Sequence, residues 1–171
     1  MEWILIGTVT KTHGLKGEMK FRAVVSDDSL FEGLKRVRLN GPKGGEKDVH
    51  IAAFRGAGAH IVRFDEVNSI EEAQLLAGWS VSIPREDFKK LPEGEFYWFE
   101  IEGLEVFDED GRFYGRVEEI IETGSNDVYV VRDEDREILL PMIDSVVKTI
   151  DLRQRKLVFH PVEGLLEDIA D

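Results

Sequence analysis

The chain has 171 residues, which is enough for one domain or for two small ones. It contains no cysteine, which excludes a disulfide scaffold, a cysteine nucleophile and a thiolate metal site. Apolar residues account for 42% of the sequence, so a packed core is expected. The start lacks the features of a signal peptide, and no apolar run approaches the roughly 18 residues of a transmembrane helix. We therefore expect a cytoplasmic protein without membrane contact.

Charge is distributed unevenly along the sequence. Residues 1–90 contain 14 basic and 13 acidic side chains, whereas residues 91–171 contain 8 basic and 22 acidic ones. The net charge of the second half is therefore −14, against +1 for the first half. A locally basic surface in the first half can hold phosphate, and the acidic half suits a basic protein. The alternative is that the acidic surface serves solubility alone.

A polar segment near the middle divides the chain. It contains Pro84, Pro92 and Gly94, and it lies where the charge changes. Such a composition is typical of an interdomain linker. We predict a first domain over residues 1–84, a linker over 85–95 and a second domain over 96–171.

The first half is predicted to consist mainly of β-strands. Apolar and polar residues alternate over residues 18–25. Met19 and Phe21 should therefore face the core. The same alternation directs Lys20 and Arg22 outward. Further strands are expected at residues 3–10, 36–39, 49–54, 60–64 and 79–83.

One helix is expected in this half, beginning after Ser69. Ser69 is a suitable N-cap, and Glu72 completes a capping box. Apolar residues then follow helical spacing up to Ala77, and Gly78 occupies a C-cap position. One short helix within a series of strands favours a small closed β-barrel, because closure removes exposed sheet edges.

The second half also predicts short, closely spaced strands. Asp110-Gly111 lies between strands expected at residues 104–107 and 113–121, which is a hairpin signal. A second turn is expected at residues 123–127. Further strands are expected at 128–131, 138–140, 146–150 and 157–159, with a short helical tail at 162–169. The predicted fold class is all-β with one short helix, as two small β-barrels in tandem.

The sequence lacks the motifs of common enzymes. None of the four histidines, His13, His50, His60 and His160, has the spacing of a zinc motif. A nucleophile elbow, a Walker loop and a dinucleotide-binding fingerprint are also missing. We therefore expect a protein that is not an enzyme, with no catalytic residue, metal site, cofactor or small-molecule substrate.

The loop after the first strand is the first candidate binding site. Gly14 and Gly17 permit a tight backbone path with positive φ. Cationic side chains surround this path and can hold nucleic-acid phosphate through charge-assisted hydrogen bonds. The candidate residues are Lys11, His13, Gly14, Lys16, Gly17, Lys20 and Arg22. The alternative is an ordinary glycine turn with solvated lysines.

Four consecutive aromatic residues, 96–99, form the second candidate site. If this segment is extended, its neighbouring side chains alternate and cannot all face one core. Some of them should then be exposed or should pack between domains. Tyr97 and Trp98 are candidate anchors of a protein interface. The alternative is a seal between the two domains.

These motifs resemble the ribosome maturation factor RimM family. The resemblance rests on residues 10–18 (TKTHGLKGE) and 91–98 (LPEGEFYW), and on three segments of the second half. Those segments are residues 103–106 (GLEV), 123–128 (TGSNDV) and 138–143 (ILLPMI), which look like the PRC-barrel domain of the family.

The resemblance implies a bacterial assembly factor, without enzymatic activity, that binds the head of the immature small ribosomal subunit. The implied partners are 16S ribosomal RNA and the nineteenth small-subunit protein, a basic polypeptide. The family's aromatic pair is commonly Tyr-Tyr and is tied to subunit binding. Here that pair is Tyr97 and Trp98, so the second ring departs from the pattern. We expect a monomer.

Two other functions are compatible with the residues. One is an adaptor whose acidic barrel binds basic proteins without RNA contact. The other is a hydrolase or a metal-dependent RNA-processing enzyme built from dispersed carboxylates and His13. The missing motifs make this enzyme the weakest of the three hypotheses.

Overall fold

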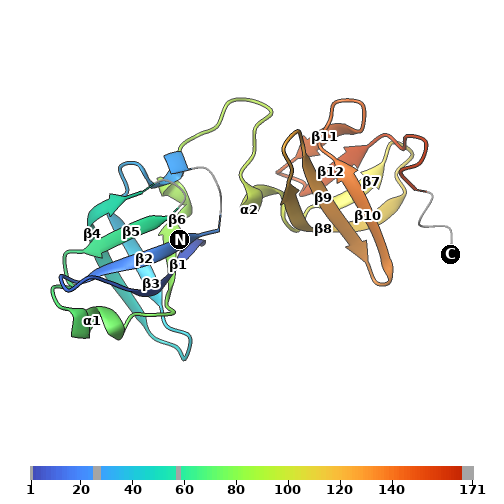
Figure 1. Cartoon of the computed structure of the whole chain (residues 1–171). Coiled ribbons are helices and arrows are strands. Elements are labelled where there is room, and N and C mark those ends of the chain that lie inside the picture. Colours follow the sequence, from blue (N-terminus) through green and yellow to red (C-terminus); the bar gives the residue numbers. More distant parts are fainter. Residues whose placement is uncertain (1, 25–27, 57–58, 167–171) are drawn as a thin grey trace. The chain divides into compact units, whose positions relative to one another are not determined.

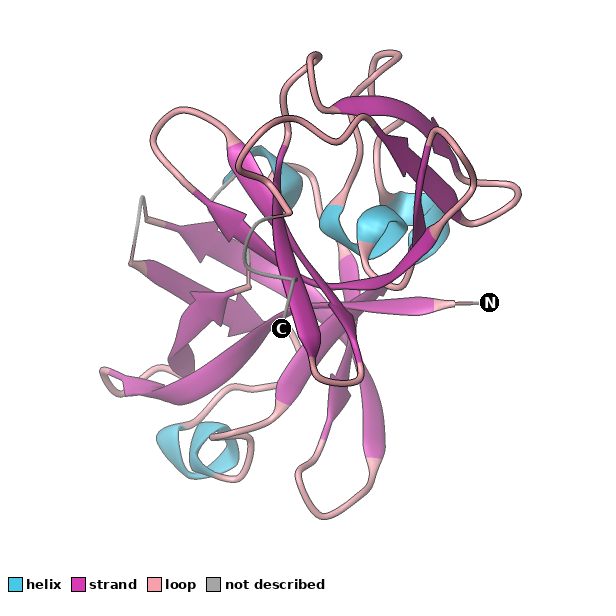
Figure 2. Ribbon diagram, turned by 90° about the vertical axis from the view of Figure 1, so that its right-hand side faces the viewer, coloured by secondary structure: helices cyan, strands magenta, loops and turns pink. Residues whose placement is uncertain are grey.

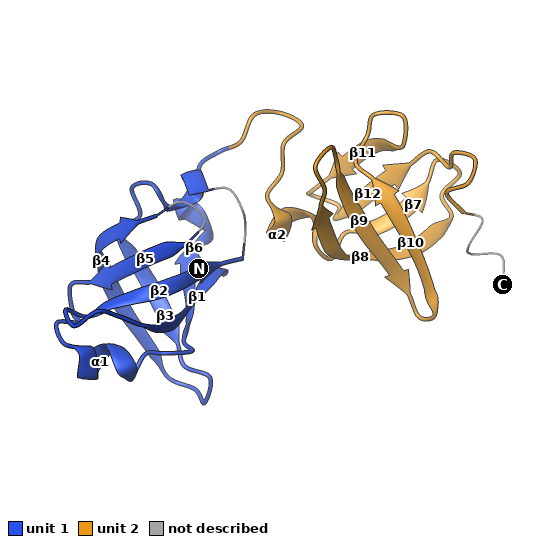
Figure 3. Ribbon diagram, viewed as in Figure 1, with its two compact units in different colours: residues 1–90 blue, residues 91–171 orange. Residues whose placement is uncertain are grey.

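The computed structural model describes residues 2–24, 28–56 and 59–166. The chain forms two compact units, Met1–Lys90 and Leu91–Asp171 (Figure 3). Strands predominate in the described residues, and the helices are short (Figure 2). Among those residues, no helix has the length and apolar character needed to cross a membrane. The domain bounds 1–84 and 96–171 and the linker 85–95 stay a prediction.

Unit 1 is a closed six-stranded barrel (Figure 1). Its strands follow the order β1-β2-β5-β4-β3-β6, which confirms the predicted closure. The strands are β1 (Trp3–His13), β2 (Glu18–Ala23), β3 (Arg36–Asn40), β4 (Glu46–Arg55), β5 (His60–Phe64) and β6 (Ser80–Pro84). Two 3₁₀ turns, η1 (Asp28–Phe31) and η2 (Arg85–Asp87), belong to the same unit.

Strand β2 shows how the sequence builds this barrel. Met19 and Phe21 are buried in the core, whereas Lys20 and Arg22 are exposed, as the alternation predicts. The last residue of the predicted strand, Val25, lies outside the described residues. Each barrel strand therefore places every second side chain on the outer surface.

Helix α1 (Ile70–Gln74) begins where the sequence predicts. The Ser69 hydroxyl accepts a hydrogen bond from the Glu72 amide at 3.1 Å. The Glu72 carboxylate accepts from the Asn68 amide at 2.9 Å, one residue before the expected partner. The helix ends three residues before Ala77, and Gly78, at φ +88°, donates its amide to the Val9 carbonyl at 2.7 Å. The turn after the helix is therefore anchored to β1.

Unit 2 is a six-stranded sheet in the order β10-β9-β8-β7-β12-β11. Its strands are β7 (Glu105–Asp108), β8 (Phe113–Glu122), β9 (Asp127–Asp133), β10 (Arg136–Pro141), β11 (Val147–Asp151) and β12 (Lys156–Phe159). The β12–β7 pair is parallel, and the other described pairs of this sheet are antiparallel. A second, separate core of buried side chains includes Leu104, Tyr129 and Phe159.

Two expectations for the second half need correction. Residues 98–101 are not extended but form helix α2 (Trp98–Ile101), so the described chain has two short α-helices instead of one. The predicted helical tail, 162–169, is turn and bend over residues 163–166. Val162 has no regular structure, and residues 167–169 lie outside the described part of the chain.

The β7–β8 hairpin is organised by Asp108. One carboxylate oxygen accepts the backbone amides of Asp110 and Arg112, and the other accepts the Tyr114 hydroxyl, each at 2.9 Å. Burial opposes ionisation of this carboxyl, yet these hydrogen bonds hold the pKa of Asp108 below its usual range. A carboxyl with a lowered pKa contributes stability above the unfolded-state pKa of about 4 and loses it as the pH falls.

Replacing Asp108 with Asn should lower the free energy of unfolding by about 1–3 kcal/mol at pH 7, because a buried charged acceptor is lost. The difference from the wild type should shrink as the pH falls below about 4, where the wild-type carboxyl also becomes neutral. Urea unfolding followed at pH 7 and at pH 3 measures both values. A pH-independent difference would contradict the role of the charge.

Candidate functional site

The glycine loop between β1 and β2 is held against the start of α1. Gly14 and Gly17 have φ values of +73° and +87°, which confirms the positive φ predicted from the sequence. A Cβ added at Gly17 would lie 2.7 Å from the Val67 carbonyl oxygen, whereas one at Gly14 would meet open space. The two glycines therefore differ: Gly17 permits close packing, and Gly14 supplies only the backbone conformation.

Five polar side chains project from this hairpin into solvent. We call them the cationic hairpin: Lys11, His13, Lys16, Lys20 and Arg22. All five are exposed, and among the described residues none of them forms an ion pair. Lys11 on β1 lies directly opposite Lys20 on β2, and Thr8 lies opposite Arg22. The structure thus brings the predicted cations together on two adjacent strands and the loop between them.

Arg36 and Arg38 of unit 1 are paired with a carboxylate of the same unit. Arg38 donates to Asp48 at 2.7 Å, and Arg36 donates to the same carboxylate at 3.2 Å. The hydrogen bond with Arg38 lowers the pKa of Asp48, and the same bond raises the pKa of Arg38. Arg38 also lies over the Trp3 ring at 3.9 Å. Arg36 and Arg38 are thus compensated within unit 1, whereas no ion pair among the described residues involves the cationic hairpin.

The second candidate site is the aromatic cluster of unit 2. Tyr97 and Phe99 stack with ring centroids 5.4 Å apart, and Trp98 packs edge-on against both. All three rings are half-buried. The Glu100 carboxylate accepts the Tyr97 amide at 2.9 Å. Helical geometry thus gathers rings that an extended strand would separate.

Arg155 fixes the end of helix α2. Its guanidinium donates to the carbonyls of Glu100 and Glu102 at 3.0 and 2.9 Å. Carbonyls at the end of a helix need such donors, because no later turn supplies them. A residue more than fifty positions away along the sequence therefore helps to hold the aromatic cluster in place.

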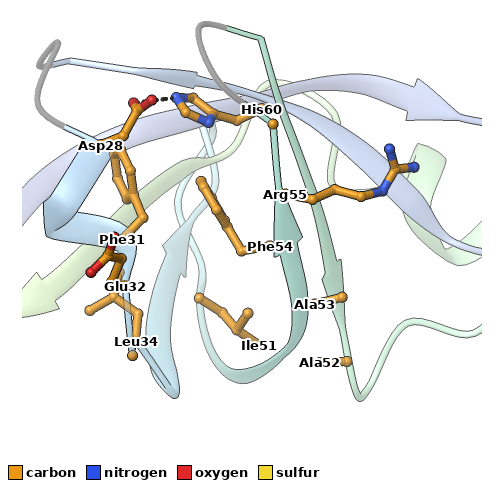
Figure 4. Close-up of a pocket in the computed structure, with 12 residues that line it drawn as sticks. Asp28, Phe31, Glu32, Leu34, Ile51, Ala52, Ala53, Phe54, Arg55 and His60 are labelled. Atoms are coloured by element: carbon orange, nitrogen blue, oxygen red, sulfur yellow. Dashed lines mark ion pairs between the residues drawn. The ribbon is translucent and has the colours of Figure 1, made fainter.

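The structure shows a polar pair in unit 1, Asp28 and His60, that the sequence does not predict. His60 is 4% exposed, and its Nε2 lies 3.0 Å from a carboxylate oxygen of Asp28 (Figure 4). The pair lines a hollow of about 470 Å³ together with Phe31 and Phe54, whose rings contact the imidazole. Among the described residues, the buried Nδ1 has no hydrogen-bond partner. The alternation His60-Ile61-Val62 could have placed His60 inward, but nothing local indicates Asp28 as its partner.

The four histidines are dispersed over the two units. They contain no cluster of three histidine, aspartate or glutamate side chains able to hold a metal ion. His13 is exposed on the glycine loop, while His60 is buried beside Asp28. His50 and His160 each face one glutamate, Glu66 and Glu109.

The two units match two domain families. Residues 4–88 match the RimM N-terminal domain, and residues 98–165 match the RimM PRC barrel domain. The first unit is thus the barrel of the N-terminal domain, and the second is a PRC barrel. These two domains in this order define a class of tandem β-barrel proteins.

Relatives match along nearly the whole chain. "Ribosome maturation factor RimM" of Ruminiclostridium cellulolyticum is 39% identical over 98% of this chain and 99% of its own length. The protein of the same name from Syntrophus aciditrophicus is 38% identical over 96% of this chain and 100% of its own. The solution structure of the N-terminal domain of RimM from Thermus thermophilus is 24% identical, covers 54% of this chain and 100% of its own, and has a TM-score of 0.45. The chain belongs to the RimM family.

Replacing Gly17 with Ala should lower the free energy of unfolding by about 2 kcal/mol or more, because a Cβ meets the Val67 carbonyl and positive φ is strained. Gly14→Ala is the matched control, and its cost should stay near 1 kcal/mol, since only the φ strain applies. Urea unfolding of both variants measures the difference. Equal losses would show that the contact with Val67 contributes nothing.

Proposed function

We propose that this protein is a ribosome assembly factor without enzymatic activity that binds the head of the immature small ribosomal subunit. The cationic hairpin of unit 1 contacts 16S ribosomal RNA. The acidic second unit, with Tyr97 and Trp98, contacts a basic head protein, the nineteenth small-subunit protein. The observation that carries the proposal is the set of cations on β1 and β2 that have no ion-pair partner among the described residues, in a family whose curated members are named ribosome maturation factors.

The geometry of the hairpin supports a phosphate ligand. Like charges directly opposite on adjacent strands destabilise a sheet, and Lys11 and Lys20 occupy such positions. Within the described residues, no carboxylate is paired with either lysine. An anionic phosphate between the two strands would relieve this repulsion and would gain charge-assisted hydrogen bonds. Such contacts position an RNA backbone without reading its bases.

The charge of the second unit supports a basic protein partner. Residues 91–171 have a net charge of −14, which repels nucleic acid and attracts cationic polypeptide. Tyrosine and tryptophan are frequent anchors in protein interfaces, because they combine apolar area with a polar atom. The half-buried aromatic cluster is preorganised by its stacking, so little side-chain freedom is lost on binding.

The proposed mechanism is selective binding without any covalent step. An assembly factor promotes one arrangement of the subunit head when its affinity for that arrangement exceeds its affinity for the others. Release must follow maturation, so the complex should be transient. Exposed ionic contacts suit this requirement, since each contributes little free energy and salt screens it.

Reversing two charges of the hairpin, Lys16→Glu with Lys20→Glu, should weaken binding to immature small subunits. With about three phosphate contacts, the logarithm of the binding constant should fall with the logarithm of salt concentration at a slope of roughly −2, and the variant should bring this slope nearer zero. Lys43→Glu with Lys47→Glu is the control, because these exposed lysines lie on or next to β4, outside the hairpin. Filter binding across a salt series measures the slopes. Wild-type affinity in the first variant would remove RNA contact from the proposal and favour the adaptor.

Replacing both Tyr97 and Trp98 with Ala should reduce co-sedimentation with immature small subunits about tenfold or more, because two interface anchors are lost. Phe113→Ala is the control, since it removes a partly exposed ring of the same unit. Circular dichroism verifies that each variant is folded. Equal binding by wild type and double variant would assign these rings to packing within the protein.

A further inference from the structure

Leu15 lies at the tip of the hairpin formed by β1 and β2. The pairing of these strands ends at His13 and Glu18, so the turn between them consists of residues 14–17. Leu15 is a central residue of this turn and is 79% exposed, more than any other large apolar side chain of the described residues. An aliphatic side chain therefore projects into solvent from a surface that otherwise presents cations.

Neither the turn nor the core requires a leucine at this position. Turns favour glycine, asparagine, aspartate, proline and serine, and Gly14 and Gly17 already supply the positive φ. Leu15 belongs to neither of the two core clusters. Single exposed apolar side chains are common on protein surfaces. Leu15 is distinguished by its place, since it lies at the tip of the surface that the proposed function assigns to a ligand.

The turn that carries Leu15 is anchored on both sides. Gly17 is buried, and it lies so close to the segment before α1 that an added Cβ would be 2.7 Å from the Val67 carbonyl oxygen. The pairing of His13 with Glu18 closes the hairpin at the base of the turn. The backbone is thus preorganised, so little of its freedom is lost when Leu15 meets a ligand.

The charges near Leu15 indicate the kind of ligand. Lys16 follows Leu15 in the turn, and Lys11 and Lys20 lie opposite each other on the two strands. Among the described residues, no carboxylate pairs with these lysines. RNA offers phosphates to the lysines and flat apolar base faces to the leucine. A protein interface would need a wider apolar surface, and the turn contains no second apolar side chain.

We propose that Leu15 packs against the face of an unstacked base, so that the hairpin prefers RNA with an unpaired nucleotide to a continuous duplex. The lysines hold the neighbouring phosphates, and Leu15 fills the space beside the displaced base. Leucine is among the apolar side chains that nucleic-acid-binding proteins insert between bases, and unpaired bases of RNA are open to such contact. This inference rests on the proposed function, because it names the class of RNA that the cationic hairpin binds.

The experiment measures binding of the full-length protein to two synthetic RNAs, a continuous duplex and the same duplex with a single unpaired nucleotide in one strand. Leu15→Ser removes the apolar contact and leaves every cation in place, whereas Leu15→Met keeps an apolar side chain of similar size. Leu75→Ser is the matched control, because Leu75 is 77% exposed and lies at the end of α1, outside the hairpin. Filter binding across a salt series gives the affinity and its slope, and circular dichroism verifies that each variant is folded.

The wild type should bind the interrupted duplex about fivefold more tightly than the continuous one. Leu15→Ser should abolish this preference and leave the salt slope unchanged, because no phosphate contact is lost. Leu15→Met and Leu75→Ser should each keep the preference to within about twofold of the wild type.

Three other outcomes would overturn the inference. If the wild type binds both RNAs with salt-dependent affinity and Leu15→Ser has no effect, the contact with a base is wrong while the proposed RNA contact stands. If the wild type binds neither RNA, the RNA contact of the proposed function fails as well. If Leu15→Ser weakens binding to both RNAs equally, or if Leu75→Ser also removes the preference, Leu15 does not recognise an unstacked base.

Discussion

Barrel closure is the constraint on which the first candidate site depends. In a closed six-stranded barrel, each strand is paired on both sides, and every second side chain must point outward. Met19 and Phe21 occupy the inward positions of β2, which fixes Lys20 and Arg22 on the outer surface. The pairing of β1 with β2 then sets Lys11 opposite Lys20. A shift of this register by one residue would bury Lys20 and expose core residues such as Met19. The barrel therefore holds Lys11 and Lys20 opposite each other despite their electrostatic repulsion.

Two kinds of arginine and lysine therefore coexist on one small barrel. Arg36 and Arg38 share Asp48 across the β3–β4 pair, and their charges are satisfied within the protein. Among the described residues, no carboxylate pairs with the cationic hairpin. Glu18, the one acidic residue of β2, is paired with Arg55 instead, with a carboxylate oxygen 2.5 Å from a guanidinium nitrogen. A charge that the protein leaves uncompensated contributes little to folding but remains available for a ligand. Arg132 of unit 2 belongs to the first kind, because Glu118 and Glu137 hold its guanidinium.

Much of the fold follows from local patterns in the sequence, whereas the details of the sites depend on distant residues. Alternation predicts β2, Ser69 predicts the start of α1, and the two glycines of the hairpin predict positive φ. The sequence does not predict helix α2, because four residues are too few to show helical periodicity. The donor to its terminal carbonyls, Arg155, is also too distant along the chain to be recognised from a local pattern. The Asp28–His60 pair likewise joins residues that meet only in the folded barrel, which one sequence does not specify. Local patterns therefore predict which side chains project from the hairpin, but not which of them face each other.

The proposed division of roles follows from what each kind of contact can discriminate. Phosphate contacts from Lys11 and Lys20 provide affinity that depends on salt, yet any RNA backbone offers the same phosphates. Selection of one subunit intermediate must therefore come from contacts that other RNA cannot supply. A partner surface seated on the aromatic cluster of the acidic second unit provides such selection, because a mismatched partner would leave charges desolvated and unpaired. The weak ionic contacts then favour rapid encounter and release, and the apolar and aromatic contacts of unit 2 determine where the factor remains bound.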